Sequence, residues 1–242
     1  QKESPMNNCT FIGRLTREPE LRFLPNNTAI ITNMDGLEWK RSKYSPRVQR
    51  FLKRAEGWAA KKSDLLVADA KEIERYLTTK YNFSQVVHIP YGANKFKDAN
   101  SNVLQEYGVE PGEYNLVISR LEPENNIATI LGGVQKSSSP KLMLVIGNHD
   151  TPYGEYLKAT FKDSRIRFIN ATYEKETINN LRYFSNIFFH GHSVGGTNPS
   201  LLEAIGCSSM ICAHDNPFNR EVLGDDATYF MDINDVSNTL DL

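Results

Sequence analysis

The sequence predicts an α/β protein in which parallel strands form sheets that helices cover on both faces. Three observations support this fold class. From residue 31 onward, short apolar runs rich in strand-forming residues alternate with amphipathic segments of helical spacing. Such alternation is typical of parallel sheets buried between helices. A chain of 242 residues with 40% hydrophobic content and a net charge of −1 is also long and apolar enough for one large core or two modest ones.

The first part of the chain predicts three strands, at 29–32, 64–70 and 86–90, with a helix between each pair. The first helix opens at Ser45 and Pro46, because proline suits the first helical turn. Its apolar residues fall on one face: Val48, Phe51, Leu52, Ala55, Trp58 and Ala59. The second helix covers 71–81. The stretch YGANKFKDANSN then predicts a linker, with a domain boundary between residues 91 and 112.

The second part of the chain repeats the alternation of strand and helix. Strands are expected at 114–119, 141–147, 165–170, 186–192 and 209–214. Helices are expected at 125–134, 154–161, 176–184, 199–206 and 218–224. The boundaries divide the chain into a segment at 1–30, a small α/β unit at 31–95 and a larger one at 112–232.

Several functional classes are disfavoured by composition. The longest apolar runs are too short to span a bilayer, and no charged region followed by an apolar stretch opens the chain. Cys9, Cys207 and Cys212 form no CxxC pair, which favours a reducing compartment over disulfides or zinc. A cytoplasmic location is therefore expected. The net charge of −1 makes nucleic acid an unlikely partner, because binding to its backbone needs a basic surface.

The stretch SVGGTNPSLLEAIG, at 193–206, is the strongest candidate for a binding site. Gly195 and Gly196 permit backbone angles closed to other residues, Thr197 or Asn198 is suited to cap a helix, and Pro199 suits its first position. Free amides at the positive end of that helix attract anions, most naturally phosphate. Glu203 lies four residues after Pro199, on the same face of the helix, where its carboxylate is placed to accept hydrogen bonds from ribose hydroxyls. The alternative is a structural turn, a structural cap and a solvated carboxylate.

A second strand end supplies a cation. Ser119 ends the strand at 114–119 and places Arg120 at its carboxyl edge, where a guanidinium neutralises a departing diphosphate. An arginine at such an edge is otherwise a solvated surface residue. No metal site is expected, because His190 and His192 lack a nearby third ligand, so that one is packed and the other lines the loop.

Four stretches resemble, in order and spacing, the donor-binding half of retaining glycosyltransferases of family four, which have the two-Rossmann GT-B fold. They are SRLEPENN, IPYGAN, HGHSVGGTNPSLLEAIG and HDNPFNREVLGDDATYF. NMDGLEWKRSKYS and LVADAKEIERYL resemble more narrowly the rhamnosyltransferase-like branch that builds bacterial surface polysaccharides. The resemblance covers roughly residues 31–232. It implies a nearly complete C-terminal donor domain, with 31–95 the remnant of a truncated acceptor domain.

The resemblance also implies roles for particular residues. The resemblance implies that the helix after the glycine loop holds the donor diphosphate through Gly196 to Pro199, and that Glu203 binds the ribose. It also implies that Arg120 binds phosphate and stabilises the leaving group. Two positions depart from the wider family: Gly195 replaces a glutamate that touches the donor sugar, and Asn125 or Asn126 replaces a lysine. The narrower branch tolerates GGTNP, so the first departure supports it.

The resemblance implies transfer of a hexose, or a deoxyhexose such as rhamnose, from a nucleoside diphosphate sugar to a saccharide or lipid-linked acceptor. It implies no cofactor and no metal.

The run 40–62 carries nine basic residues and a single acidic one, Glu56. It is expected to be a solvated surface and is a candidate contact with anionic lipid at the inner face of a membrane.

The first thirty residues resemble a different family. Residues 6–30 are similar to the opening of bacterial single-stranded-DNA-binding proteins, with arginines interleaved with Phe11 and Phe23. The segment is too short for a five-stranded OB-fold, so the chain resembles a chimera or fusion. Its two strand-forming stretches are candidates for self-association. The alternative function is therefore an inactive nucleotide-binding fragment, or a chimera with a DNA-binding segment.

Overall fold

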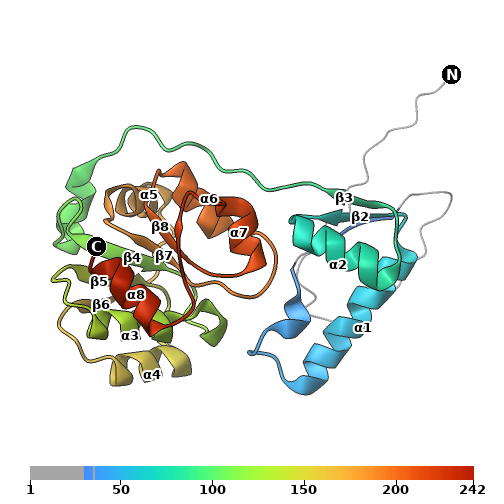
Figure 1. The fold of residues 1–242 in the computed structure, drawn as a ribbon, viewed down its shortest axis with the longest axis horizontal. Coiled ribbons are helices and arrows are strands. Elements are labelled where there is room, and N and C mark those ends of the chain that lie inside the picture. The colour runs from blue at the N-terminus through green and yellow to red at the C-terminus, as the bar shows by residue number, and fades with distance from the viewer. Residues whose placement is uncertain (1–29, 35) are drawn as a thin grey trace.

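The computed structural model describes residues 30–34 and 36–242, which form two parallel sheets with helices packed against them (Figure 1). The α/β class predicted from the sequence is therefore confirmed. The predictions for 1–29, including the DNA-binding resemblance and the self-associating strands, lie outside the described residues. Of the segment predicted at 1–30, the structure describes Ile30 alone.

The smaller sheet has the order β1-β2-β3, with all neighbours parallel. Its strands are β1 (Ile31–Asn33), β2 (Leu65–Ala68) and β3 (Val86–His88). A short 3-10 helix, η1 (Glu38–Lys40), precedes α1 (Pro46–Lys62), and α2 (Lys71–Tyr81) connects β2 to β3. Leu66, Ala68, Ile73 and Leu77 form the centre of the small core between this sheet and its helices.

Helix α1 leaves much of its apolar face exposed. The sequence places its apolar residues on one face, but Val48, Phe51 and Trp58 are exposed, and within α1 only Ala60 is fully buried. Phe51 and Trp58 contact each other edge to face, with ring centroids 6.2 Å apart. The helix therefore presents an apolar strip to solvent beside its basic side chains.

The larger sheet has the order β6-β5-β4-β7-β8-β9, again parallel throughout. Its strands are β4 (Tyr114–Ile118), β5 (Leu142–Ile146), β6 (Ile166–Ile169), β7 (Phe188–His190), β8 (Ile211–His214) and β9 (Thr228–Phe230). Its α-helices are α3 (Ile127–Lys136), α4 (Pro152–Thr160), α5 (Lys175–Phe184), α6 (Pro199–Gly206), α7 (Pro217–Leu223) and α8 (Ile233–Leu240). Two short 3-10 helices, η2 (Ser101–Tyr107) and η3 (Pro123–Asn125), flank β4.

Adjacent residues of the central strands belong to different cores. Val117 and Phe189 pack into one cluster with α3 and α8, whereas Leu116 and Phe188 pack into the other with α5 and α6. Because side chains alternate across a strand, a strand that is apolar along its length buries both of its faces. This explains why the apolar runs of the sequence are continuous.

The last helix has no counterpart in the sequence prediction. Helix α8 packs closely on α3, and a Cβ added to Gly133 would lie 2.2 Å from a methyl carbon of Val236. Glycine at this position lets the two helices approach without a clash. Helix α8 thus extends the larger unit beyond residue 232 and closes one face of its core.

Two buried or partly buried carboxylates join the two sheet units. Glu221 of α7 accepts hydrogen bonds from the backbone amides of Lys71, at 2.8 Å, and Glu72, at 3.4 Å, and so caps α2. Asp69, after β2, accepts one from the amide of Thr197 at 2.8 Å. Residues 89–100, which include most of the predicted linker at 91–102, contain no helix or strand. Figure 1 shows this segment as the long connection from β3 to the larger unit.

Candidate functional site

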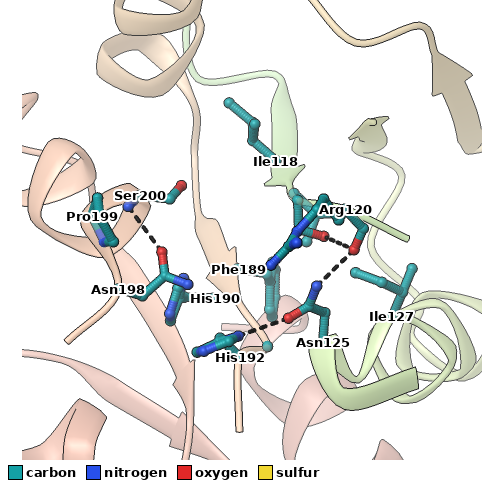
Figure 2. Close-up of a pocket in the computed structure, with 13 residues that line it drawn as sticks. Ile118, Arg120, Asn125, Ile127, Phe189, His190, His192, Asn198, Pro199 and Ser200 are labelled. Atoms are coloured by element: carbon teal, nitrogen blue, oxygen red, sulfur yellow. Dashed lines mark hydrogen bonds between the residues drawn. The ribbon is translucent and has the colours of Figure 1, made fainter. Parts of the chain in front are cut away.

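The candidate site lies where the strand order of the larger sheet reverses direction. The chain proceeds outward from β4 to β5 and β6, then returns to the other side of β4 with β7. In open parallel sheets, the crevice at such a reversal, outside the carboxyl ends of the strands, is where ligands bind. A cavity of about 270 Å³ lies at this point (Figure 2). The polar residues that line it are Ser119, Arg120, Asn125, His190, His192, Asn198 and Ser200.

The wall nearest to α6 is the beginning of that helix, as the sequence predicts. Asn198 is the N-cap residue and its side-chain oxygen accepts a hydrogen bond from the amide of Ser200 at 2.9 Å. Pro199 occupies the first helical turn. Pro199 and Ser200 line the cavity together with the cap (Figure 2). The positive end of the helix dipole therefore faces the cavity.

The two glycines of the loop are required for different reasons. Gly195 has a φ of 111°, which side chains rarely adopt. Gly196 does not have a positive φ, so the expectation of a special backbone angle is wrong for this residue. A Cβ on Gly196 would instead lie 2.4 Å from Oδ2 of Asp69, so close approach of the carboxylate requires glycine.

The expectation of free loop amides needs a correction. The amide of Thr197 donates to Asp69, and the amide of Ser200 donates to Asn198. The Thr197 hydroxyl also donates to the backbone carbonyl of Asp69 at 3.1 Å. A carboxylate at the loop is nonetheless informative, because it shows that the loop accommodates a negatively charged group.

Arg120 lies at the cavity on an exposed strand end, as predicted, and its backbone is held in place. Asn125 donates from Nδ2 to the carbonyl of Arg120 at 2.6 Å, and its Oδ1 lies 2.9 Å from Nδ1 of His192 (Figure 2). Ser119 donates to the same carbonyl at 3.1 Å. Asn125 therefore supplies no charge and connects two walls of the cavity.

A second arginine approaches the cavity from the smaller unit. Arg41 forms an ion pair with Glu38, with Nε 2.6 Å from Oε1. Its Nη2 lies 3.9 Å from the position that a Cβ on Gly195 would take. Arg41 and Arg120 are both close enough to His192 to lower its pKa. The cavity is therefore flanked by positive charge from both sheet units.

The two histidines are neutral at physiological pH. Burial lowers the pKa of His190 to about 3, with smaller effects of the same sign from His192, Arg182 and His214. Burial, Arg41 and Arg120 lower the pKa of His192 to about 4. His190 is packed and His192 lies beside the loop, as predicted. Nε2 of His190 has no hydrogen-bond partner in the described part of the chain, although this residue lines the cavity.

Glu203 lies one turn farther along α6 and does not line the cavity. Its Oε2 is 2.8 Å from Nη1 of Arg182, a residue of α5 whose side chain is only 3% exposed. The Glu203 side chain is itself 46% exposed, so this carboxylate remains accessible to a ligand. The sequence pattern indicates Glu203 but not its partner Arg182.

Four residues of the site escaped sequence reasoning in whole or in part: Asp69, Arg41, Asn125 and Arg182. Asp69 and Thr197 are 128 positions apart, so no local pattern connects them. Arg182 stands in a helical segment without a motif. The sequence indicates Asn125 or Asn126 only as a departure from the resembled family. Among residues 30–34 and 36–242, no group of three histidine, cysteine or acidic side chains is arranged to hold a metal ion.

Comparison with known proteins gives one family and a set of similar structures. Residues 20–94 match a family described as a domain of unknown function, DUF1972. No curated protein matches the chain. HepE from Anabaena, solved in complex with UDP-glucose, is 13% identical with a TM-score of 0.73, over 88% of this chain and 61% of that one. Sucrose-phosphate synthase from Thermosynechococcus elongatus is 14% identical with a TM-score of 0.69, over 86% and 56%.

A third structure, TarM, is 11% identical with a TM-score of 0.66 and covers 89% of this chain and 43% of its own length. This chain thus spans about two fifths to three fifths of the structures that it resembles. At these identities the likeness concerns the fold. The two parallel-sheet units have the GT-B glycosyltransferase fold.

Proposed function

We propose that this chain binds a nucleoside diphosphate sugar and forms the donor-binding part of a glycosyltransferase. The observation that carries the proposal is the cavity at the strand-order reversal, which combines Arg120 with the N-terminus of α6. Both features attract anions, and a diphosphate has the charge and size to contact both. Among the similar structures, HepE is solved with UDP-glucose and with UDP, which supports a nucleotide sugar as donor.

In the proposed reaction, the bond between the anomeric carbon and the diphosphate breaks and the diphosphate leaves with the electron pair. An acceptor hydroxyl forms the new bond to that carbon and transfers its proton to an oxygen of the leaving diphosphate. Arg120 and the dipole of α6 stabilise the charge that develops on the leaving diphosphate. Because His190 and His192 are neutral, they add no charge of either sign beside it.

Glu203 is proposed to bind the ribose of the nucleotide. Its side chain is half exposed and lies one helical turn beyond the α6 residues that line the cavity. A carboxylate accepts hydrogen bonds from two neighbouring hydroxyls, which suits a ribose. Gly195, Gly196 and Thr197 are proposed to contact the same donor, in competition with Asp69.

The finer specificity is proposed from the resemblance alone. We propose a deoxyhexose such as rhamnose as the transferred sugar, a saccharide or lipid-linked molecule as acceptor, and family four as the affiliation. No metal or cofactor is required in this proposal, because Arg120 and α6 supply the positive charge that a cation otherwise brings. The absence of a metal requirement would be contradicted if excess chelator weakened donor binding tenfold or more and magnesium restored it.

Contact with a membrane is proposed for helix α1. Val48, Phe51 and Trp58 are exposed on a helix that also carries Arg47, Arg50, Lys53 and Arg54. Apolar side chains flanked by cations favour the surface of anionic lipid bilayers. No helix in the described residues is long and apolar enough to cross a membrane.

Calorimetric titration with UDP, dTDP, GDP and ADP tests the proposal. We expect micromolar binding of at least one nucleoside diphosphate and weaker binding of its monophosphate. Arg120→Ala should weaken the diphosphate at least tenfold, because a charge-assisted hydrogen bond contributes about 1.5 to 3 kcal/mol. Arg75→Ala serves as the control, since Arg75 is an exposed arginine that does not line the cavity.

Two results would contradict the proposal. One is the absence of binding of all four diphosphates to the folded protein. The other is equal affinity of the wild type and Arg120→Ala. Binding without any turnover in the presence of acceptor lipids and saccharides would support the alternative of an inactive nucleotide-binding fragment.

A further inference from the structure

We propose that Arg182 is a positioning residue that orients Glu203 toward the hydroxyl groups of the bound ribose. The inference rests on the proposed function, since it concerns the residue that binds the nucleotide. No sequence pattern indicates a role for Arg182. Its contacts with α6 are the starting point.

The guanidinium of Arg182 contacts two residues of α6 at once. Nη1 lies 2.8 Å from Oε2 of Glu203, and Nη2 donates to Oγ of Ser200 at 2.9 Å. Ser200 lines the cavity, whereas Glu203 lies one turn farther along the helix. The rigid, planar fork of donors therefore fixes the carboxylate relative to the cavity wall.

The arrangement leaves half of the carboxylate for a ligand. Arg182 engages Oε2, and Oε1 makes no hydrogen bond within the described part of the chain. A glutamate that is 46% exposed would otherwise sample many rotamers and lose that freedom on binding. Holding it in one geometry beforehand lowers this cost, which is how preorganisation raises affinity.

Stability of the fold does not explain the arginine. Burial lowers the pKa of Arg182, a sign that the surroundings disfavour its charge, and its Nε has no hydrogen-bond partner among the described residues. Its guanidinium lies 5.7 Å from the centroid of the Phe188 ring, in an apolar core. Its partner Glu203 is half exposed, and an ion pair with a solvated partner contributes little to stability. A costly cation that contacts a half-exposed carboxylate is better explained by what the carboxylate binds.

The experiment compares the affinities for UDP and for 2′,3′-dideoxyuridine diphosphate, which lacks both ribose hydroxyls. If another base binds best in the titration above, the corresponding pair replaces these two. We expect the wild type to prefer the ribonucleotide about tenfold or more, and Glu203→Ala to lose this preference. Arg182→Met should lose most of the preference while its melting temperature stays within a few degrees of the wild type. Arg182→Lys should recover part of it.

Two further variants separate positioning from stability. Arg165→Met removes another partly buried arginine, whose Nη2 lies 2.7 Å from Oδ2 of Asp163 and which does not line the cavity. This variant should lower the melting temperature and leave the preference for the ribonucleotide unchanged. In Glu203→Ala, adding Arg182→Met should cause no further loss, because the two residues act as a unit.

Each result decides for or against the inference. A preference that survives Arg182→Met, but not Glu203→Ala, would overturn the role of Arg182 and leave the proposed function intact. Equal loss of affinity for both nucleotides in Arg182→Met would also overturn it, in favour of a structural role. A wild type that binds diphosphates without any ribose preference would refute the ribose contact of Glu203 and the inference with it. A wild type that binds no diphosphate would overturn the proposed function as well.

Discussion

His190 illustrates how a single residue of the core links the cavity to the stability of the protein. It ends β7, stacks on Phe188 with ring centroids 6.5 Å apart and lines the cavity. The residue is only 5% exposed. A protonated imidazole there would lack water around it and would face the positive charge of Arg182. The neutral form is therefore part of the folded state.

The first prediction concerns the dependence of stability on pH. The pKa of His190 is lowered to about 3 in the folded protein and is about 6.5 when unfolded, so the unfolded chain binds more protons between these values. The contribution is therefore complete above pH 6.5 and is lost as the pH falls toward 3. We expect the free energy of unfolding to fall by on the order of 1 kcal/mol per pH unit from each such histidine.

Denaturant titrations at pH 7, 6 and 5 measure this slope. His192, whose pKa is lowered to about 4, contributes with the same sign. In His190→Gln the slope should be smaller by the share of one histidine. An unchanged slope in that variant would mean that His190 is protonated in the folded protein.

At the element scale, helix α8 depends on its first turn. Asp232 is the N-cap residue and accepts hydrogen bonds from the amides of Asn234, at 2.7 Å, and Asp235, at 3.1 Å. Asp235 accepts in return from the amides of Met231 and Asp232. These bonds to the Asp232 carboxylate lower its pKa. The reciprocal cap starts the helix that closes one face of the larger core.

We expect Asp232→Ala to destabilise the protein by about 0.5 to 2 kcal/mol, because the helix loses its cap. Hydrogen exchange should accelerate in α8 and on the face of α3 that it covers. Asp226→Ala is the control, since the exposed side chain of Asp226 makes no hydrogen bond in the described part of the chain. Equal effects of the two substitutions would refute a specific role of the cap.

The elements differ in how far the sequence predicts them. Strands β4 to β8 of the larger sheet were predicted because continuous apolar runs such as LMLVI are typical of buried parallel strands, and α6 was predicted because Asn198 and Pro199 form a local cap. Strand β9, which has only three residues, was not predicted. Helix α8 was not predicted, because its apolar residues are few and its cap uses Asp235 in place of the more familiar glutamate or glutamine. The exposure of α1 could not be predicted, because spacing states which residues share a face but not what covers that face.

The candidate site, like the elements, was predicted where local sequence determines it and missed where it depends on distant residues. Its location could be predicted, because Ser119, Arg120, Asn198 and Pro199 are local features of strand and helix ends, and they line one cavity. The contacts of Glu203 with Arg182 and of Thr197 with Asp69 could not be predicted, because they join residues far apart in sequence. Whether these residues bind the donor is what the titrations test.

At the scale of the whole molecule, each sheet unit places a carboxylate near a helix beginning of the other. Glu221 of the larger unit caps α2, which has no side-chain cap of its own, and Asp69 of the smaller unit binds the loop before α6. Ser42 adds a hydrogen bond to the buried Glu124 at 2.7 Å. The relative position of the units therefore depends on these polar contacts and on Phe218 of α7, which packs against the core of the smaller unit.

The third prediction tests the contact at the glycine loop. Gly196→Ala would place a Cβ 2.4 Å from Oδ2 of Asp69, so the carboxylate or the units must shift. We expect a loss of about 1 to 3 kcal/mol in the free energy of unfolding, as for other overpacked sites. Denaturant titration measures it, and most of the loss should disappear when Asp69→Ala is the background.

Gly92→Ala is the matched control, because nothing lies within 4 Å of the added Cβ. It should change stability by less than about 0.5 kcal/mol. If Gly196→Ala is equally costly with and without the Asp69 carboxylate, the strain arises elsewhere in the loop.

Hydrogen bonds at both ends shorten the free part of the connection between the units. The amide of Ile89 is bound to the carbonyl of Ala68 at 2.9 Å, and the amide of Phe96 to that of Gly206 at 2.7 Å. Only residues 90–95 are then left to span the units, which reach about 20 Å at most. A tether of this length keeps the Asp69 carboxylate near the Thr197 amide at an effective concentration in the millimolar range. A dissolved anion that needs this amide competes with an internal ligand, so its apparent dissociation constant is larger than the intrinsic one.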